Sequence, residues 1–287
     1  MTMSMLLGVL TAILSSAALN VGVVLQALDA RQAPPEEALR LSLLSNLARH
    51  RRWLAGFGLI GIGFGLQVLA LSLAPFVVVQ PVLASGLLLV LVLGVRILDE
   101  RIGAAEVLGV LGIVGGIALL TIGTPSGTEK VASPTAAIVV TTVLGGVAFL
   151  PLALRGRGRF DSATFVMVAS GLAFGAGNIT TKMISDSIGA SDALVAGLWL
   201  LAALITAVIA LITEMTALQR RPATIVVPLI FSVQTFLPVV LEPIYLQDRW
   251  GSAALDGAPL IVGLLMVLLG SVAVARTRAV SALVAAP

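Results

Sequence analysis

Polar side chains are scarce within the long apolar stretches of this chain, and the few that occur there mark where binding chemistry could take place. Placing a Lys or Asp at the centre of a membrane helix costs about 2.5–3.5 kcal/mol, so a polar residue in such a stretch is a candidate for a functional role. Amides donate and accept hydrogen bonds, and ionised groups can hold a charged ligand. The candidates are Asn20, Gln26, Gln67, Gln80, Asn178, Lys182, Gln234 and Glu242.

Four of these amides are predicted to bind a substrate: Gln67, Gln80, Asn178 and Gln234. Gln80 precedes Pro81, which removes a helical N–H donor and frees a backbone carbonyl nearby. Gln234 lies near the centre of its apolar stretch. The alternative interpretation is that each amide forms an ordinary interhelical hydrogen bond, worth about 0.6 kcal/mol.

Lys182 and Glu242 are expected at equal depth, each within a turn of the outer end of its span. As a pair they would form an outer gate or anchor a charged substrate. Unpaired, each would extend its charged end to the membrane interface. Glu100 and Asp248 are interpreted as structural residues at helix ends.

Several classes of chemistry are excluded by what the sequence lacks. There is no cysteine, and His50 is the one histidine, so thiol catalysis and a Cys/His zinc site are excluded. The G-x-G-x-x-G at 56–61 lies inside an apolar stretch with no preceding strand and does not predict a dinucleotide site. The net charge of +3 is too small for a nucleic-acid surface. We therefore expect no enzyme, no cofactor, no metal centre and no nucleic-acid partner.

The composition predicts an all-α polytopic membrane protein. Hydrophobic residues make up 59% of the 287 residues and charged residues 11%, whereas a soluble domain has about 25% charged residues. Stretches of roughly 18–25 apolar residues can cross a hydrocarbon core of about 30 Å as helices. Nine are expected, near residues 4–28, 53–73, 76–97, 103–122, 135–154, 164–184, 193–213, 223–245 and 258–275.

Residues 29–52 are too charged to cross the membrane. Pro34 and Pro35, followed by Glu36 and Glu37, favour a helix start. Leucines then recur every four residues, at 39, 43 and 47. The segment is predicted to form a short amphipathic helix that lies on the cytoplasmic membrane surface.

The basic residues predict the orientation. With nine spans, 14 of the 17 Lys and Arg residues fall on the odd-numbered connections and the C-terminus, and three fall on the other side. Because cytoplasmic loops collect Lys and Arg, we expect the N-terminus outside and the C-terminus inside a plasma (inner) membrane.

An internal repeat is indicated by paired prolines. A shift of 147 residues places Pro75 on Pro222 and Pro81 on Pro228, and LDERIG (98–103) then lies close to LQDRWG (246–251). The third span thus corresponds to the eighth, and the odd separation inverts one half relative to the other. We expect a first repeat at 1–122, with four membrane helices and segment 29–52, a linker at 123–134, and a second repeat of five helices at 135–287. Inverted repeats are typical of alternating-access transporters.

The stretch LALSLAPFVVVQPVLASGLLLVLVLGVRILDERIG resembles the core of the drug/metabolite transporter (EamA-like) superfamily, with Ala-Pro, a second proline six residues on and Leu-x-Glu-Arg. The nine-helix arrangement, ATIVVPLIF and NITTKMI are similar to its NIPA-like magnesium-transporter branch. In that resemblance, segment 29–52 replaces the second helix of the first half. Gly63 and Gln67 stand where that branch has an acidic residue and then an Asn.

These observations predict a secondary transporter that moves a small organic solute by alternating access, because the amides expected at the midplane are neutral. The first alternative is a NIPA-like divalent-cation carrier for magnesium, which the resemblance implies. A non-transporting membrane scaffold is the alternative from another class. The expected partners are the lipid bilayer and the substrate, and the sequence leaves a homodimer open.

Overall fold

The computed structural model describes residues 3–123, 133–245 and 258–284, and these residues are helical apart from short connections. Eight of their helices are long and apolar enough to cross a membrane, and the apolar stretch described for α9, Ala223–Leu237, is shorter. The chain is an all-α polytopic membrane protein. The elements are α1 (Met3–Ala30), η1 (Pro35–Glu37), α2 (Leu41–Leu47), α3 (Arg51–Leu73), α4 (Phe76–Ile97), α5 (Ala104–Gly123), α6 (Pro134–Ala153), η2 (Gly158–Asp161), α7 (Ala163–Gly189), α8 (Ala193–Arg220), α9 (Ala223–Tyr245) and α10 (Ala258–Val284).

Each of the nine predicted spans coincides with a described helix, most of them to within about three residues at each end. The three largest differences are at the C-terminal ends of α7, α8 and α10, which continue to Gly189, Arg220 and Val284. The extra turns of α8 are rich in helix-forming residues and are largely buried.

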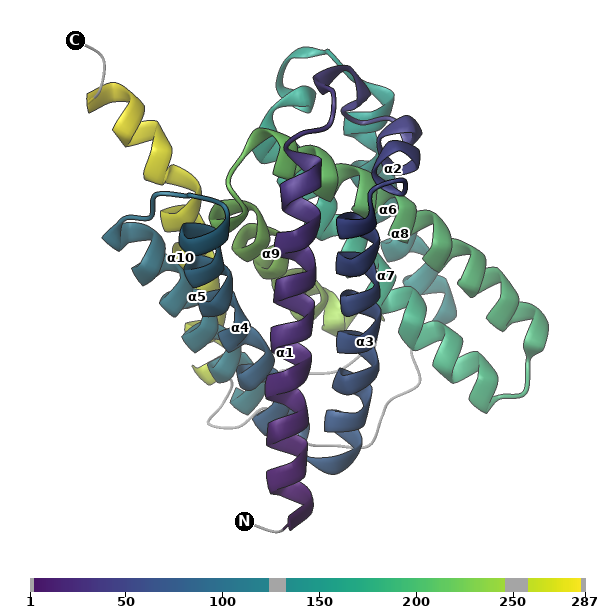
Figure 1. The fold of residues 1–287 in the computed structure, drawn as a ribbon. Coiled ribbons are helices and arrows are strands. Elements are labelled where there is room, and N and C mark those ends of the chain that lie inside the picture. Colours follow the sequence, from purple (N-terminus) through teal and green to yellow (C-terminus); the bar gives the residue numbers. More distant parts are fainter. Residues whose placement is uncertain (1–2, 124–132, 246–257, 285–287) are drawn as a thin grey trace.

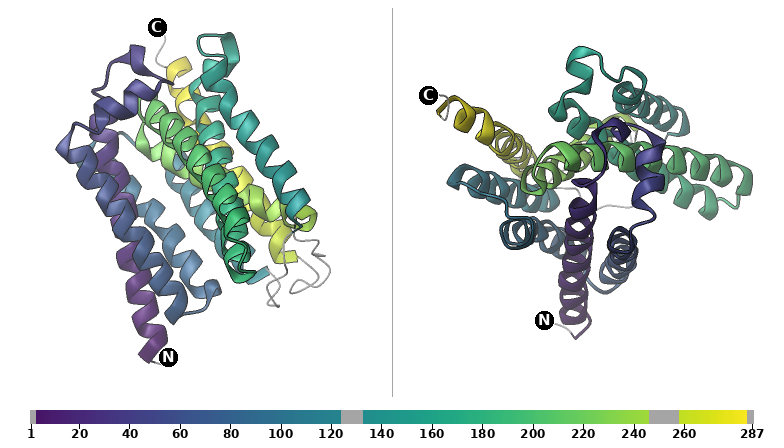
Figure 2. Two further views of the ribbon diagram at one scale, coloured as in Figure 1. Left: turned by 90° about the vertical axis from the view of Figure 1, so that its right-hand side faces the viewer. Right: turned by 45° about the horizontal axis from the view of Figure 1, so that its top comes forward.

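The long helices run between two ends of the molecule, with the N-terminus at one end and the C-terminus at the other (Figures 1 and 2). Segment 31–52, the loop 98–103, the loop 154–162 and the α8–α9 junction lie at the same end. Contacts of Arg31 with Glu100, and of Arg220 with Asp161, tie these connections together. This confirms that the basic connections share one side, called here the arginine-rich end.

The helices pack in matching partnerships. α1 lies along α3 as α7 lies along α8, and α1 also contacts α4 as α7 contacts α9. α5 packs along α10. These partnerships relate α1, α3, α4 and α5 to α7, α8, α9 and α10, and among the described helices they leave α6 unmatched. In this matching, segment 29–52 lies between α1 and α3, which correspond to the consecutive helices α7 and α8. The division into repeats at 1–122 and 135–287 stays a prediction.

Segment 29–52 differs from the expected surface helix. Its helix α2 covers Leu41–Leu47, and the predicted leucine face, Leu39, Leu43 and Leu47, is buried in the protein core at 0–4% exposure. Leu39 has a φ of +57°, and its N–H donates to Thr216 Oγ1 at 2.9 Å. The leucines therefore cover the end of α8 instead of lying in the membrane, because that end offers an apolar surface to bury.

Candidate functional site

A cavity of about 650 Å³ lies among seven helices: α1, α3, α4, α5, α7, α8 and α9. Its walls are mainly leucine, isoleucine, valine and phenylalanine side chains. Cavities of roughly 300–1,000 Å³ with apolar walls and a few polar groups are typical of small-ligand sites. The polar residues that line it are Asn20, Gln67, Gln80, Thr121, Asn178, Glu214, Gln234 and Thr235.

All four amides predicted to bind substrate line this cavity, although they come from α3, α4, α7 and α9. Gln67, Gln80 and Gln234 are half-buried and Asn178 is exposed. Within the described residues, none of the four side chains forms a hydrogen bond. None of the polar atoms of the three glutamines is fully buried, so a ligand can reach them. The four amides are therefore not the interhelical hydrogen bonds of the alternative interpretation, and their polar atoms are available to a ligand. That they bind one stays a prediction.

Two further lining residues, Asn20 and Thr121, have side chains that are anchored by a hydrogen bond to the backbone. Asn20 Nδ2 donates to the carbonyl of Ser16 at 2.7 Å, which leaves its Oδ1 as an acceptor. Thr121 Oγ1 donates to the carbonyl of Ile117 at 2.7 Å, so its remaining lone pairs are acceptors. Gln26, another of the sequence candidates, does not line the cavity: its Cγ lies against the α3 backbone at Gly56, 3.0 Å from where a Cβ would stand.

Glu214 is the residue that sequence reasoning missed. Its carboxylate is the one ionisable group among the described residues that line the cavity, and the residue is 7% exposed. Within the described part of the chain it has no ion pair or hydrogen bond. The predicted span 193–213 ends one residue before it, whereas the helical sequence TEMTALQR continues α8 to Arg220. This helical sequence was the signal in the chain that Glu214 belongs to the same helix as the apolar span.

Lys182 is predicted to pair with Glu242, but in the structure it pairs with a different residue. Its Nζ pairs with Asp186 Oδ1 at 2.7 Å, one turn further along α7. Residues four apart lie on the same face of a helix, so Asp186 is within reach of Lys182 without any movement of a neighbouring helix. Lys182 also lies seven residues from the end of α7, deeper than expected. The side chain of Glu242 lies outside the described residues.

Glu100 is confirmed as a structural residue at a helix end. It is 6% exposed and accepts hydrogen bonds from the first two N–H groups of α9, those of Ala223 at 2.7 Å and Thr224 at 2.9 Å. Carboxylates stabilise helix N-termini, where N–H groups lack intrahelical partners. Its repeat counterpart, Asp248, lies outside the described residues.

The arrangement suits an ion or a small polar ligand held by oxygen atoms within apolar walls. Within the described residues, no three His, Cys, Asp or Glu side chains are grouped as they would be in a metal centre with several ionisable ligands. One carboxylate and several amide and hydroxyl side chains are among the described residues that line the same cavity. This is a ligand set for a hard cation that keeps part of its water shell.

Comparisons with known proteins extend this description. Residues 3–280 match the family model described as Magnesium transporter NIPA. A probable magnesium transporter, NIPA9, of Arabidopsis thaliana is 37% identical over 111 residues, 39% of this chain and 31% of that protein. An uncharacterised protein of Corynebacterium glutamicum is 34% identical over 104 residues, 36% of each chain. The chain thus spans about a third of the length of these curated relatives. No solved structure matches it.

Proposed function

We propose, from the premise that the chain belongs to the magnesium transporter NIPA family, that its cavity carries a divalent cation, magnesium, across the membrane. The family makes the chain a membrane transporter, which supports the expectation that it is not an enzyme. The alternative drawn from the sequence resemblance is therefore favoured over the organic solute.

The observation that carries this proposal is the carboxylate of Glu214 in the cavity. The choice of an organic solute depended on a midplane lined only by neutral amides. An ionised carboxylate without a basic partner is strongly unfavourable in an apolar surrounding, so Glu214 requires either a proton or a bound cation. A bound cation supplies the missing charge.

The neutral amide oxygens of the cavity add the further oxygen ligands that a partly hydrated magnesium ion needs. Magnesium is usually held through one or two carboxylates while it keeps several waters. Six waters occupy about 180 Å³ at ~30 Å³ each, so a cavity of about 650 Å³ has room for the hydrated ion. In this proposal Glu214 contacts the ion, and Asn20, Gln67, Gln80, Asn178 and Gln234 hold its water shell or replace part of it.

We also propose that the arginine-rich end faces the cytoplasm of an inner membrane, with the N-terminus outside. The support is the uneven distribution of Lys and Arg over short connections, 14 to 3. A homodimer remains a prediction from the sequence alone.

Uptake of Mg²⁺ into liposomes that contain the purified protein and an enclosed Mg²⁺ indicator tests the proposed substrate. We expect saturable uptake that is lost in Glu214→Gln, a change that keeps the size of the side chain and removes its charge. Glu36→Gln is the matched control, because Glu36 is an exposed glutamate outside the cavity, and its uptake should equal that of the native protein.

Binding can be measured separately from transport by thermal unfolding in detergent. A ligand at about 100 times its dissociation constant stabilises the native state by about 2.7 kcal/mol. Mg²⁺ should therefore raise the melting temperature of the native protein and of Glu36→Gln, but not of Glu214→Gln. Equal uptake and equal stabilisation in Glu214→Gln would contradict the role of the carboxylate. Stabilisation by an organic solute instead of Mg²⁺ would favour the solute carrier.

A further inference from the structure

The arginine-rich end of the cavity is held by polar contacts between helices α1–α5 and helices α6–α10. Trp53 Nε1 donates to the sulfur of Met215 at 3.3 Å. The N–H of Leu39 donates to Thr216 Oγ1, and the amide of Gln219 lies 3.4 Å from the carbonyls that precede η1. These contacts place segment 33–53 against the last turns of α8, directly beyond Glu214.

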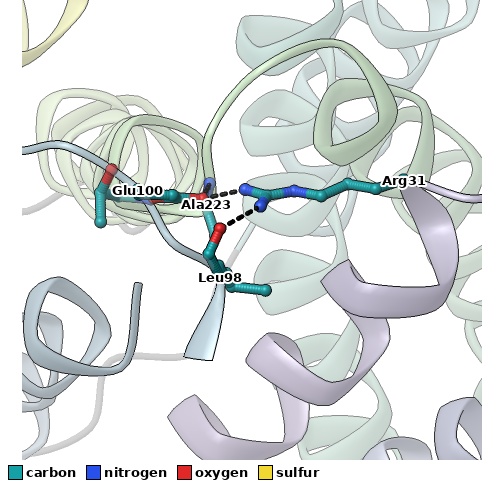
Figure 3. Close-up of polar contacts among 5 residues, drawn as sticks. Arg31, Leu98, Glu100 and Ala223 are labelled. Atoms are coloured by element: carbon teal, nitrogen blue, oxygen red, sulfur yellow. Dashed lines mark hydrogen bonds and ion pairs between the residues drawn. The ribbon is translucent and has the colours of Figure 1, made fainter. Parts of the chain in front are cut away.

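An ion pair that also holds a helix N-terminus is centred on Glu100 at this end (Figure 3). Its two carboxylate oxygens accept the N–H groups of Ala223 and Thr224, at the start of α9. Arg31, at the end of α1, pairs with the same carboxylate and donates to the carbonyl of Leu98 at 3.2 Å. One side chain from the loop 98–103 thus joins α1 to α9.

Glu100 has one partner in its own part of the chain, Arg31, and one in the other part, the N-terminus of α9. Arg31, Leu98 and Glu100 all belong to the first part of the chain, whereas Ala223 and Thr224 begin α9. If the two parts separate at this end, Arg31 can stay with Glu100 while the N-terminus of α9 leaves. The carboxylate then keeps a charged partner, so the separation does not strand a buried anion.

The helix that Glu100 holds is also a wall of the cavity. Val227, one turn from the start of α9, lines it, as do Ile230 and Gln234 further along. Val227 is 8% exposed and lies between the Glu100 contact and the polar part of the cavity. Movement of the start of α9 away from the loop 98–103 would therefore open a route from the arginine-rich end.

We propose that Glu100, supported by Arg31, is the latch of a gate at the arginine-rich end: it holds the N-terminus of α9 in the position described here and releases it when the cavity opens to that side. The inference concerns access to the cavity. It depends on the proposed function only for the identity of what crosses.

The natural absence of cysteine allows a direct test, because one introduced thiol is the only one in the protein. Val227→Cys serves as the reporter, and a membrane-impermeant thiol reagent is added to one side of sealed vesicles of known orientation. Combining the reporter with Glu100→Gln leaves an amide that cannot supply the charge at the helix N-terminus. We expect labelling from the arginine-rich side to rise about tenfold, because hydrogen bonds to charged groups are worth about that factor or more. Labelling from the opposite side should fall.

Two further variants distinguish the loss of a latch from a general loss of structure. Asp99→Asn changes the exposed neighbour of Glu100 in the same loop and should leave both labelling rates unchanged. Arg31→Lys keeps the charge but loses the guanidinium geometry that reaches both Leu98 and Glu100, and it should shift the two rates in the same directions as Glu100→Gln, by less.

Opposite changes on the two sides support the latch. Unchanged rates in Glu100→Gln, or faster labelling from both sides, would overturn it, since the latter indicates a loosened fold. If Glu100→Gln does not fold, the same two rates measured in Arg31→Lys decide the matter. No cation is needed in this experiment, so its outcome is independent of whether the cavity transports magnesium.

Discussion

At the scale of single residues, the cavity combines one charge with several neutral acceptors. Glu214 supplies the charge, while Gln67, Gln80 and Gln234 face the same space without a hydrogen bond inside the described structure. A neutral amide that already had a protein partner would have to break that bond to hold a ligand. These amides have no such cost, which favours a binding role over a packing role.

Replacing a cavity amide by leucine should reduce transport without unfolding the protein. Gln234→Leu and Gln67→Leu each remove oxygen atoms from the cavity and leave no protein group unpaired. We expect Mg²⁺ uptake to fall about tenfold or more in each variant, since an interaction with a charged group is worth about 1.5–3 kcal/mol. Uptake in liposomes and gel filtration in detergent measure the two effects. Normal uptake by both variants would exclude these amides from the transport path.

Gln26 provides the opposite case. Its side chain is fully buried between α1 and α3, and among the described residues neither its oxygen nor its nitrogen has a hydrogen-bond partner. Gln26→Met keeps the volume and removes the unpaired amide, so it should stabilise the protein by about 1 kcal/mol and leave uptake unchanged. Thermal unfolding in detergent measures the gain. A lower melting temperature would show that the amide has a partner that the structure does not contain.

At the scale of elements, glycines decide how closely helices approach. Gly61 with Gly65 on α3 has the G-x-x-x-G spacing of helix contacts, yet a Cβ on either would meet nothing within 4 Å. Gly56 and Gly63, seven residues apart, instead pack against α1. Gly116 lies against α10, where a Cβ would stand 2.7 Å from the carbonyl oxygen of Gly263. The contacting glycines are therefore the ones with no room for a side chain.

Two substitutions in α3 test this distinction. Gly63→Ala places a Cβ 2.8 Å from Cγ of Leu19 and 3.0 Å from its backbone N, so α1 and α3 must move apart. We expect a loss of about 1–3 kcal/mol for such overpacking. Gly61→Ala meets open space and should gain about 0.5–1 kcal/mol from its higher helix propensity. Melting temperatures compare the two, and equal effects would mean that the tight contact with Leu19 is absent in the membrane.

At the scale of the whole molecule, the described connections lie at two ends, and most of the basic residues in them are at one end. Segment 31–52 and the α8–α9 junction lie at the arginine-rich end, and the α7–α8 junction lies at the other (Figure 1). The proposed latch at Glu100 lies at the same end. The proposed orientation and the proposed gate therefore concern one surface of the protein.

Thiol labelling of intact cells tests the orientation. Ser191→Cys, in the α7–α8 junction, should react with a membrane-impermeant reagent, whereas Ser45→Cys, in α2, should react only after the cells are permeabilised. Both positions are exposed, so accessibility within the protein does not limit the reaction. The reverse pattern would invert the proposed topology.

The sequence by itself determined the membrane class, the nine spans, the shared side of the basic connections and four cavity amides. Each of these depends on a local property. A run of apolar residues must cross the membrane as a helix, because its backbone groups have no other partners there, and a polar residue within the run stands out against its neighbours. Neither inference requires knowledge of which helices touch.

The tertiary structure decided which polar groups share the cavity, where the leucines of α2 are buried, which glycines make contact and what Glu100 holds. Each of these depends on the rotation and depth of one helix relative to another that is distant in the chain. Hydrophobic periodicity sets neither quantity in a membrane helix, because the face toward lipid and the face toward protein are both apolar. Glu214 at the end of an apolar run, and Glu100 at the N-terminus of a helix 123 residues later, acquire their roles only when the helices pack.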